Sequence, residues 1–288
     1  MDLMPAQMKK ATDGFSVAVI GAGNWGGSLA AALENAGLGP QESIGRDWRR
    51  ARLDARVIWI CVPDAAVAQV AKKIAARRAN LRGQIVVHSS GALPAAVLEP
   101  ARRAGARIAA VHPVMSFPTR SMVPLEGVMF GIEARDAVVR RELSALVRRL
   151  GGLPFAVKAE TKALYHAAGI FASPLLVSAI TAAMETAELA GLDAETAAEW
   201  VRALVEATVA NVFARGAGRS FSGPFARGDT KTIHLHLQAL EAHPILADVY
   251  RSLARYAIGA RYAIAALPVK NRRALEKAVG HGSGRRSS

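Results

Sequence analysis

A lysine and a histidine four residues apart form a candidate proton-donating pair. Lys162 and His166 fall in a stretch that predicts a helix over about 161–190, so the two side chains share one helix face. An ammonium beside an imidazole can donate a proton to the oxygen or nitrogen of a C=O or C=N bond that receives a hydride. The alternative is a first-turn lysine near a histidine whose hydrogen bonds are satisfied within the protein.

Three further side chains could orient a substrate. Arg227 and Asp229 lie in the run Gly-Pro-Phe-Ala-Arg-Gly-Asp at 223–229, which predicts a rigid turn between two helices. The alternative is that Asp229 only caps the next helix while Arg227 is exposed. His112 precedes a proline at the end of a predicted strand, so its imidazole is expected at the sheet edge, as a substrate ligand or as a structural hydrogen-bonding group.

Two serines follow another predicted strand, over 84–88. Ser89 and Ser90 are expected to face a cofactor cleft, Ser89 toward the cofactor and Ser90 toward a substrate carboxylate or phosphate. The alternative is that they cap the helix that begins near residue 93. Cys61 is interpreted as a small core hydrophobe rather than a nucleophile.

A fold must position these residues, and the stretch at 17–27 predicts the first strand, turn and helix of that fold. Residues 17–20 predict a buried strand, followed by Gly21, Gly23 and Gly26 and then by an alanine-rich helix. Glycines in this spacing allow a tight turn, a close approach of backbone to a pyrophosphate, and packing of the helix on the sheet. The N-terminus of the helix would then bind the dianion, which predicts dinucleotide binding. The alternative is an ordinary strand-to-helix turn.

Other residues near this turn are also predicted to contact the cofactor. Asn24 and Trp25 lie within the glycine run, and Val62 and Pro63 end a third predicted strand, where ligands bind in open α/β sheets. Arg46 ends a short second strand, about 20 residues past the glycines, where the adenosine ribose is recognised.

The residues after this second strand favour NADP. Arg46 is followed by Arg49 and Arg50, which suit a 2′-phosphate, whereas Asp47 leaves NAD as the less favoured cofactor. The alternative is a solvated basic turn.

Strands and helices alternate up to residue 158, and only helices are predicted from 159 to 267. The pattern predicts an α/β protein with a doubly wound parallel (Rossmann) sheet, followed by an all-α domain. The expected organisation is a flexible leader (1–14), a dinucleotide-binding domain (15–158), a helical substrate domain (159–267) and a basic disordered tail (268–288). Residues 167–184 carry no charge, but small and polar residues dilute their hydrophobicity, which favours a buried central helix over a membrane span.

Composition narrows the function classes. The formal net charge is +14, of which +5 lies in the last 20 residues, and no nucleic-acid motif accompanies it, so nucleic-acid binding is not favoured. The lone cysteine and the polar first 14 residues fit a cytoplasmic protein. His234 and His236 face different sides of a predicted helix, and with no Cys/His cluster a metal site is not expected.

Several short blocks together resemble a known family. The chain resembles Rossmann-like proteins with a C-terminal domain of unknown function 2520, through the glycine run and through Val62-Pro63-Asp64, His88-Ser89-Ser90-Gly91, His112-Pro113, Tyr165-His166-Ala167-Ala168 and residues 223–229. That family is similar to a wider group with a helical, 6-phosphogluconate-dehydrogenase-like C-terminal domain, which includes β-hydroxyacid dehydrogenases, ketopantoate reductase, pyrroline-5-carboxylate reductase and deazaflavin-linked NADP reductases. In that group a Lys-x-x-x-Asn pattern is often catalytic. Lys162 matches the lysine, but His166 stands in place of the asparagine.

The resemblance implies a homodimer formed through the helical domains and a small-molecule substrate. We therefore expect an NADP-dependent oxidoreductase that transfers hydride between nicotinamide and a small carbonyl, hydroxy-acid or imine substrate in an interdomain cleft. Lys162 and His166 are the expected catalytic residues, and Ser90, His112, Arg227 and Asp229 are expected to bind the substrate. The alternative is a non-catalytic NADP-binding sensor or scaffold protein.

Overall fold

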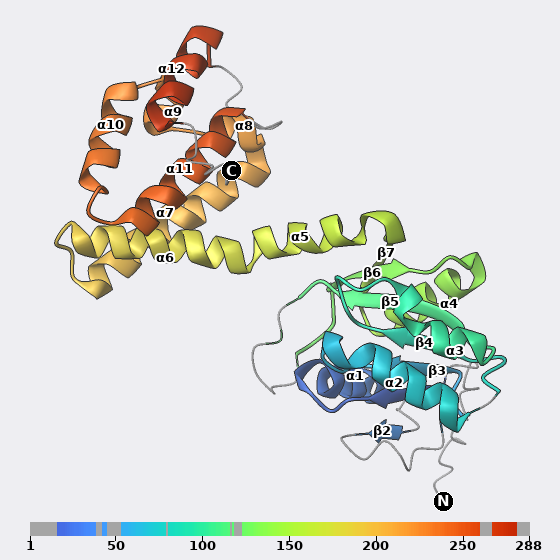
Figure 1. Cartoon of the computed structure of the whole chain (residues 1–288). Helices are drawn as coiled ribbons and strands as arrows, with labels where there is room; N and C mark the ends of the chain where they lie inside the picture. The colour runs from blue at the N-terminus through green and yellow to red at the C-terminus, as the bar shows by residue number, and fades with distance from the viewer. Residues whose placement is uncertain are drawn as a thin grey trace, which may run out of the picture. The chain divides into compact units, whose positions relative to one another are not determined.

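The computed structural model describes residues 16–38, 53–78, 80–115, 117, 123–259 and 267–280, and the backbone alone for 42–44. The chain divides into two compact units, Met1–Ile170 and Phe171–Ser288, which Figure 1 shows in colour order along the chain. The division falls inside helix α5 (Lys162–Ala172), not at residue 159 as the sequence predicts. The first turns of α5 hydrogen-bond to strands of the first unit, which explains the later division.

The first unit is built on a seven-stranded sheet in the order β2-β1-β3-β4-β5-β6-β7. The predicted α/β fold is thus present, but β6 runs antiparallel to β5, whereas every other pair is parallel. Among the described residues no helix lies between β5 and β6, and a parallel pairing requires such a crossover. The strands are β1 Val17–Ile20, β2 Glu42–Ile44, β3 Val57–Ile60, β4 Ile85–His88, β5 Arg107–Pro113, β6 Met129–Glu133 and β7 Leu153–Ala156.

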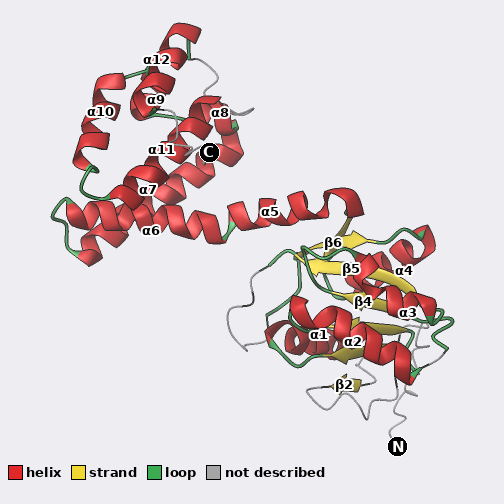
Figure 2. Cartoon of the chain, in the orientation of Figure 1, coloured by secondary structure: helices red, strands yellow, loops and turns green. Residues whose placement is uncertain are grey.

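Helices cover both faces of this sheet, as Figure 2 shows. Val17 and Val19 of β1 pack into one core with residues of α1 and α4, while Ile20 packs into a second core with residues of α2 and α3. Burial on both faces explains why β1, β3 and β4 are almost continuously apolar. The helices are α1 Asn24–Asn35, α2 Asp64–Arg77, the 3₁₀ turn η2 Ala95–Leu98, α3 Glu99–Arg103 and α4 Ala137–Arg149.

The parallel strands bring their carboxyl ends to one edge of the sheet. Ile20 of β1 pairs with Ile60 of β3, which pairs with His88 of β4, which pairs with Ala110 of β5. The segments that leave β1 and β4 therefore start near each other and carry the glycine turn and the two serines, while His112 lies near the carboxyl end of β5 itself.

The second unit is entirely helical in its described part. Its main core joins α10, α11 and α12 through Ile233, Ile258 and Leu275, among others. The helices are α6 Pro174–Leu189, α7 Ala194–Arg215, α8 Ala217–Ser220, α9 Gly223–Arg227, α10 Thr230–Ala239, α11 Pro244–Gly259 and α12 Val269–Val279.

Two sequence predictions about this helical region are wrong. The tail predicted as disordered from 268 forms α12 over Val269–Val279, because Leu275 and Val279 share one helix face and are buried. The single helix predicted over about 161–190 is two helices, because Pro174 has no N–H to continue α5 and instead begins α6.

The predicted burial of this apolar stretch is also absent in the single chain. Of α5 and α6 together, only Lys162 and Ala187 are buried. Among the described residues, Ala159–Leu189 is the one segment long and apolar enough to cross a membrane, with a mean hydropathy of 1.8. Length and composition alone decide that criterion, and core helices of soluble proteins also meet it.

Candidate functional site

The glycine turn after β1 has little room for side chains. Gly21 has a φ of +113°, and a Cβ there would lie 2.2 Å from the carbonyl oxygen of Cys61. A Cβ at Gly26 would lie 1.8 Å from the carbonyl oxygen of Gly21. Gly23 faces open space, and no side chain of a described residue caps the N-terminus of α1. The turn therefore leaves the first N–H groups of α1 available to an anion.

Asn24 and Trp25, predicted as cofactor contacts, hold this turn in place. The Asn24 side-chain amide donates to the carbonyl oxygen of Phe117 (2.8 Å). The indole N–H of Trp25 donates to the Ser89 hydroxyl oxygen (2.6 Å), and so does the indole N–H of Trp59 (2.7 Å). Ser89 is therefore engaged with two indoles of the core, which ties the turn to β3 and β4.

The end of β3 borders the same turn. Burial raises the pKa of the Cys61 thiol to about 12, so the thiol stays protonated, which fits its interpretation as a core residue rather than a nucleophile. Val62 lies against the turn, since its Cγ1 is 3.2 Å from a Cβ placed at Gly21. Pro63 is exposed and precedes the first residue of α2.

The segment after β4 is fixed by buried polar groups. The backbone N–H of Ser90 donates to His88 Nδ1 (3.1 Å), so the ring proton is on Nε2, which donates to the carbonyl oxygen of Pro94 (3.2 Å). The pKa of His88 is lowered to about 4, mainly by burial and to a smaller extent by the positive charge of Lys162. The sequence analysis gave His88 no role of its own, because a lone histidine at a strand end carries no signal.

Ser90 holds the loop ahead of η2 and does not cap that helix, whose N-cap is Pro94 with no side-chain hydrogen bond. Its hydroxyl oxygen accepts from the backbone N–H groups of Ala92 (3.2 Å) and Leu93 (2.9 Å). The hydroxyl donates to Asp64 Oδ2 (2.7 Å), so its hydrogen-bonding capacity is used within the protein.

His112 meets Tyr165 and His166 at the end of β5. His112 Nδ1 lies 2.7 Å from the Tyr165 hydroxyl, and the ring centroids of the two histidines are 5.9 Å apart. A Cβ at Gly91 would lie 2.8 Å from His112 Nε2 and 2.5 Å from His166 Cδ2, so only glycine fits between them. We call His112, Tyr165 and His166 the imidazole–phenol cluster.

His112 and Tyr165 of this cluster are neutral near pH 7. The pKa of His112 is lowered to about 4, mainly by burial and to a smaller extent by its electrostatic interactions with His166 and Lys162. Burial raises the pKa of Tyr165 to about 12. In the tautomer in which the phenol donates to Nδ1 of His112, the ring proton is on Nε2, the atom that faces Gly91. A neutral imidazole held in this way is a hydrogen-bond donor to a ligand.

Lys162, predicted as the proton donor, lies in a buried ion pair. Its Nζ is 3.1 Å from Glu133 Oε2, and the two residues are 3% and 5% exposed. Burial lowers the pKa of Lys162, and the carboxylate of Glu133 opposes that shift. The structure thus brings Lys162 to Glu133, which the sequence analysis missed because an isolated glutamate 29 residues away gives no signal.

Arg227 and Asp229 belong to the second unit. Their run is the short helix α9 and its end rather than a plain turn: Gly228 has a φ of +71° and closely approaches the side chain of Asn271. Asp229 caps α10 by accepting from the Thr232 N–H (3.1 Å), and Arg227 is exposed, as the alternative reading held. Arg46 and its neighbours Asp47, Arg49 and Arg50 lie outside the described residues.

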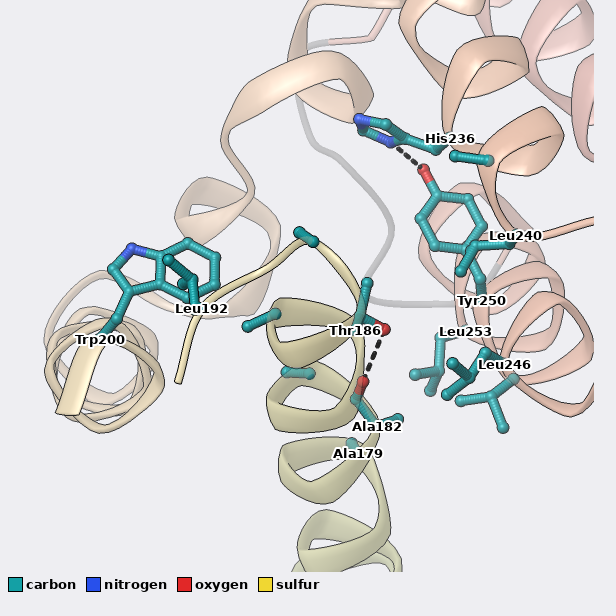
Figure 3. Close-up of a pocket in the computed structure, with 15 residues that line it drawn as sticks. Ala179, Ala182, Thr186, Leu192, Trp200, His236, Leu240, Leu246, Tyr250 and Leu253 are labelled. Carbon is teal, nitrogen blue, oxygen red and sulfur yellow. Dashed lines mark hydrogen bonds between the residues drawn. The ribbon is translucent and has the colours of Figure 1, made fainter. Parts of the chain in front are cut away.

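The second unit holds an apolar pocket of about 520 Å³ that the sequence did not predict. Figure 3 shows alanines of α6 on one wall, Trp200 of α7 on another, and Leu246 and Leu253 of α11 opposite. Its polar pair is His236 and Tyr250, whose hydroxyl lies 3.0 Å from His236 Nδ1. Among the described residues of the whole chain, no group of three His, Cys, Asp or Glu side chains is placed to hold a metal ion.

The comparisons with known proteins agree with this architecture. A family model named Rossmann-like domain matches residues 47–113, and the model of the domain of unknown function DUF2520 matches residues 128–257. No curated protein matches the sequence.

Three solved structures show the same fold at low identity. Protein TM1727 from Thermotoga maritima is 22% identical with a TM-score of 0.63, over 82% of this chain and 96% of that one. An imine reductase from Myxococcus stipitatus in complex with NADP⁺ is 20% identical with a TM-score of 0.61, over 86% and 96%. A pyrroline-5-carboxylate reductase from Coxiella burnetii is 18% identical with a TM-score of 0.53, over 93% and 97%. The chain thus combines a segment that matches the Rossmann-like domain model with a C-terminal segment that matches the DUF2520 model.

Proposed function

We propose that the protein is an NADP-dependent reductase of a small carbonyl or imine substrate. The observation that carries this proposal is the meeting, at one sheet edge of the first unit, of the imidazole–phenol cluster and a glycine turn that no described side chain caps. The open space at Gly23 and the free N–H groups of α1 suit a pyrophosphate. The NADP⁺ complex of the similar imine reductase supports this choice of cofactor. We expect Arg46 to select the 2′-phosphate.

The cofactor, when bound, supplies the hydride. The Nε2–H of His112 donates a hydrogen bond to the substrate oxygen or nitrogen, and this bond strengthens as negative charge develops there. The Tyr165 hydroxyl holds the His112 ring in the required tautomer. His166 supplies the proton that the heteroatom gains. Lys162, which the sequence suggested as this donor, instead has the role of holding α5, because its ammonium is buried against Glu133.

Turnover tests this assignment. We would incubate NADPH carrying deuterium at the transferred position with panels of oxo acids, ketones and cyclic imines, and detect deuterium in the reduced product by mass spectrometry. His166→Gln is expected to lower kcat about 100-fold or more and to leave the Kd for NADPH unchanged. His234→Gln, at an exposed histidine of the second unit, is the matched control. Unchanged turnover in His166→Gln would remove His166 from the proposed mechanism.

The rival function is a sensor or scaffold that binds NADP without turnover. It predicts NADPH binding with no deuterium transfer to any substrate of the panels. The cluster argues against it, because a neutral His112 held by Tyr165 beside Gly91 is more than a nucleotide site requires.

We further propose that two copies associate through the helical unit, and that the protein is cytoplasmic. On α6 and α7 large apolar side chains are exposed, including Val177 at 60% and Phe213 at 87%. A second copy of the same surface would cover these residues. Light scattering without detergent would show the dimer mass, whereas recovery only in detergent micelles would favour membrane binding through Ala159–Leu189 instead.

A further inference from the structure

We infer that Glu133 is a positioning residue that holds the segment 89–95 and helix α5 at a fixed spacing. This inference rests on the proposed function, because the imidazole–phenol cluster is the site whose geometry the spacing sets. Glu133 ends β6 and is 5% exposed, and among the described residues its hydrogen bonds go to Ala95 and Lys162, not to the glycine turn or the imidazoles.

The Glu133 carboxylate bridges two segments that are far apart in sequence. Its oxygens accept from the backbone N–H of Ala95, at 2.9 and 3.1 Å, where the segment 89–95 enters η2. Oε2 also accepts from Lys162 Nζ at 3.1 Å, in the first turn of α5. One side chain is therefore anchored to both the loop and the helix.

Each of these segments supplies one side of the cluster. The loop carries Gly91, and α5 carries Tyr165 and His166, which lie three and four residues beyond Lys162 and so about one helical turn away. The clearance at Gly91 is small, since even a Cβ would lie 2.5 Å from His166 Cδ2. A change in the distance between loop and helix would therefore alter how the imidazoles face a substrate.

The side chains of His88 and Ser90 do not connect the loop to α5 as Glu133 does. His88 and Ser90 fix the loop internally and to Asp64 of α2, but the structure shows no hydrogen bond from either side chain to α5 among the described residues. Apolar side chains of similar volume could replace a buried ion pair without loss of stability, but they would leave the Ala95 N–H without a partner. The carboxylate thus does more than neutralise Lys162, because it also satisfies a buried N–H of the loop.

Hydrogen exchange followed by mass spectrometry tests the bridge without any need for turnover. Lys162 makes no hydrogen bond to the loop, yet Lys162→Met is expected to speed amide exchange about tenfold in the peptide covering 88–98 as well as in that covering 159–170. Glu133→Gln should do the same to both peptides. Exposed Lys158→Met and Glu160→Gln, on the residues that precede α5, are matched controls that should change neither peptide by more than twofold.

Kinetics then separates positioning from simple support of the fold. Glu133→Asp keeps the charge but shortens the reach, and it should lower kcat about tenfold with KM and the Kd for NADPH within twofold. Glu133→Asp also keeps the inference testable if Glu133→Gln does not fold. Faster exchange confined to 159–170 in Lys162→Met, or an unchanged kcat in Glu133→Asp, would overturn the inference. Coupled exchange in a protein that binds no NADPH would support the bridge and reject the proposed function.

Discussion

The two units of the chain use their apolar residues differently. In the first unit every residue of β1, β3 and β4 is buried, and helices cover both faces of the sheet. In the second, helices α6 and α7 bury only Ala187, Ala197 and Val201 between them. The comparison teaches that the sheet unit completes its own core, whereas the helical unit leaves apolar surface for something else to cover.

The polar residues of the two units also differ in their use. The first unit buries His88, Glu133 and Lys162 and pairs each of them at the sheet edge. In the second unit, the acidic residue of the 223–229 run serves to cap a helix. The parts suited to chemistry therefore lie in the unit that is complete by itself.

The largest expected effect comes from the glycine turn of the first unit. Gly26→Ala places a Cβ 1.8 Å from a backbone oxygen, so the turn must move, and we expect a loss of about 4 kcal/mol or more in unfolding free energy together with loss of NADPH binding. Gly27→Ala, one residue on, meets nothing within 4 Å and should keep both properties. Circular dichroism and nucleotide titration would measure them. Equal behaviour of the two variants would mean that the turn is not rigid.

The imidazole–phenol cluster should be sensitive to the same kind of change. Gly91→Ala forces the two imidazoles apart, so kcat is expected to fall about 100-fold while NADPH still binds. Gly169→Ala in α5 has open space around it and serves as the control. Steady-state kinetics on the substrate found in the deuterium assay gives the answer, and full activity in Gly91→Ala would contradict the placement of the site.

Acid should weaken the first unit more than the second. His88 and His112 have pKa values lowered to about 4, below the usual 6.5, so the unfolded chain binds protons first as the pH falls. Their contribution is complete above pH 6.5 and is lost between about pH 6.5 and 4, at up to roughly 3 kcal/mol each. Thermal unfolding of wild type and His88→Asn at pH 7 and 5 measures it. A wild-type midpoint that does not fall at pH 5 would rule out neutral buried histidines.

The smallest expected effect comes from a charge placed on the exposed face of α6 in the second unit. If a second copy covers α6, Val177→Glu should convert dimer to monomer and leave the sheet unit folded. Leu153→Glu changes an exposed apolar residue of β7, 51% exposed, and should leave the mass unchanged. Light scattering compares the two variants. A dimer that persists in Val177→Glu would place the interface elsewhere.

The sequence predicted the features that depend on local spacing. Strand, glycines and helix follow one another within 20 residues, so the turn could be located from the sequence alone. The bridge between Glu133 and Lys162 could not be predicted, because it depends on how β6 and α5 pack. The basic residues of 270–277 concealed the buried pair Leu275 and Val279, and thus α12. Hydrophobicity alone likewise could not distinguish a stretch buried within its own chain from one left exposed.

The central claim is that the first unit binds NADPH at the glycine turn, and one titration tests it most directly. Trp25 and Trp59 lie beside that turn, so excitation of tryptophan should produce energy transfer to a bound nicotinamide. In a Trp200→Phe background, which removes the indole of α7, we predict saturable transfer with NADPH, weaker transfer with NADH, and none in Gly26→Ala. No transfer from the folded protein with either nucleotide would contradict the account.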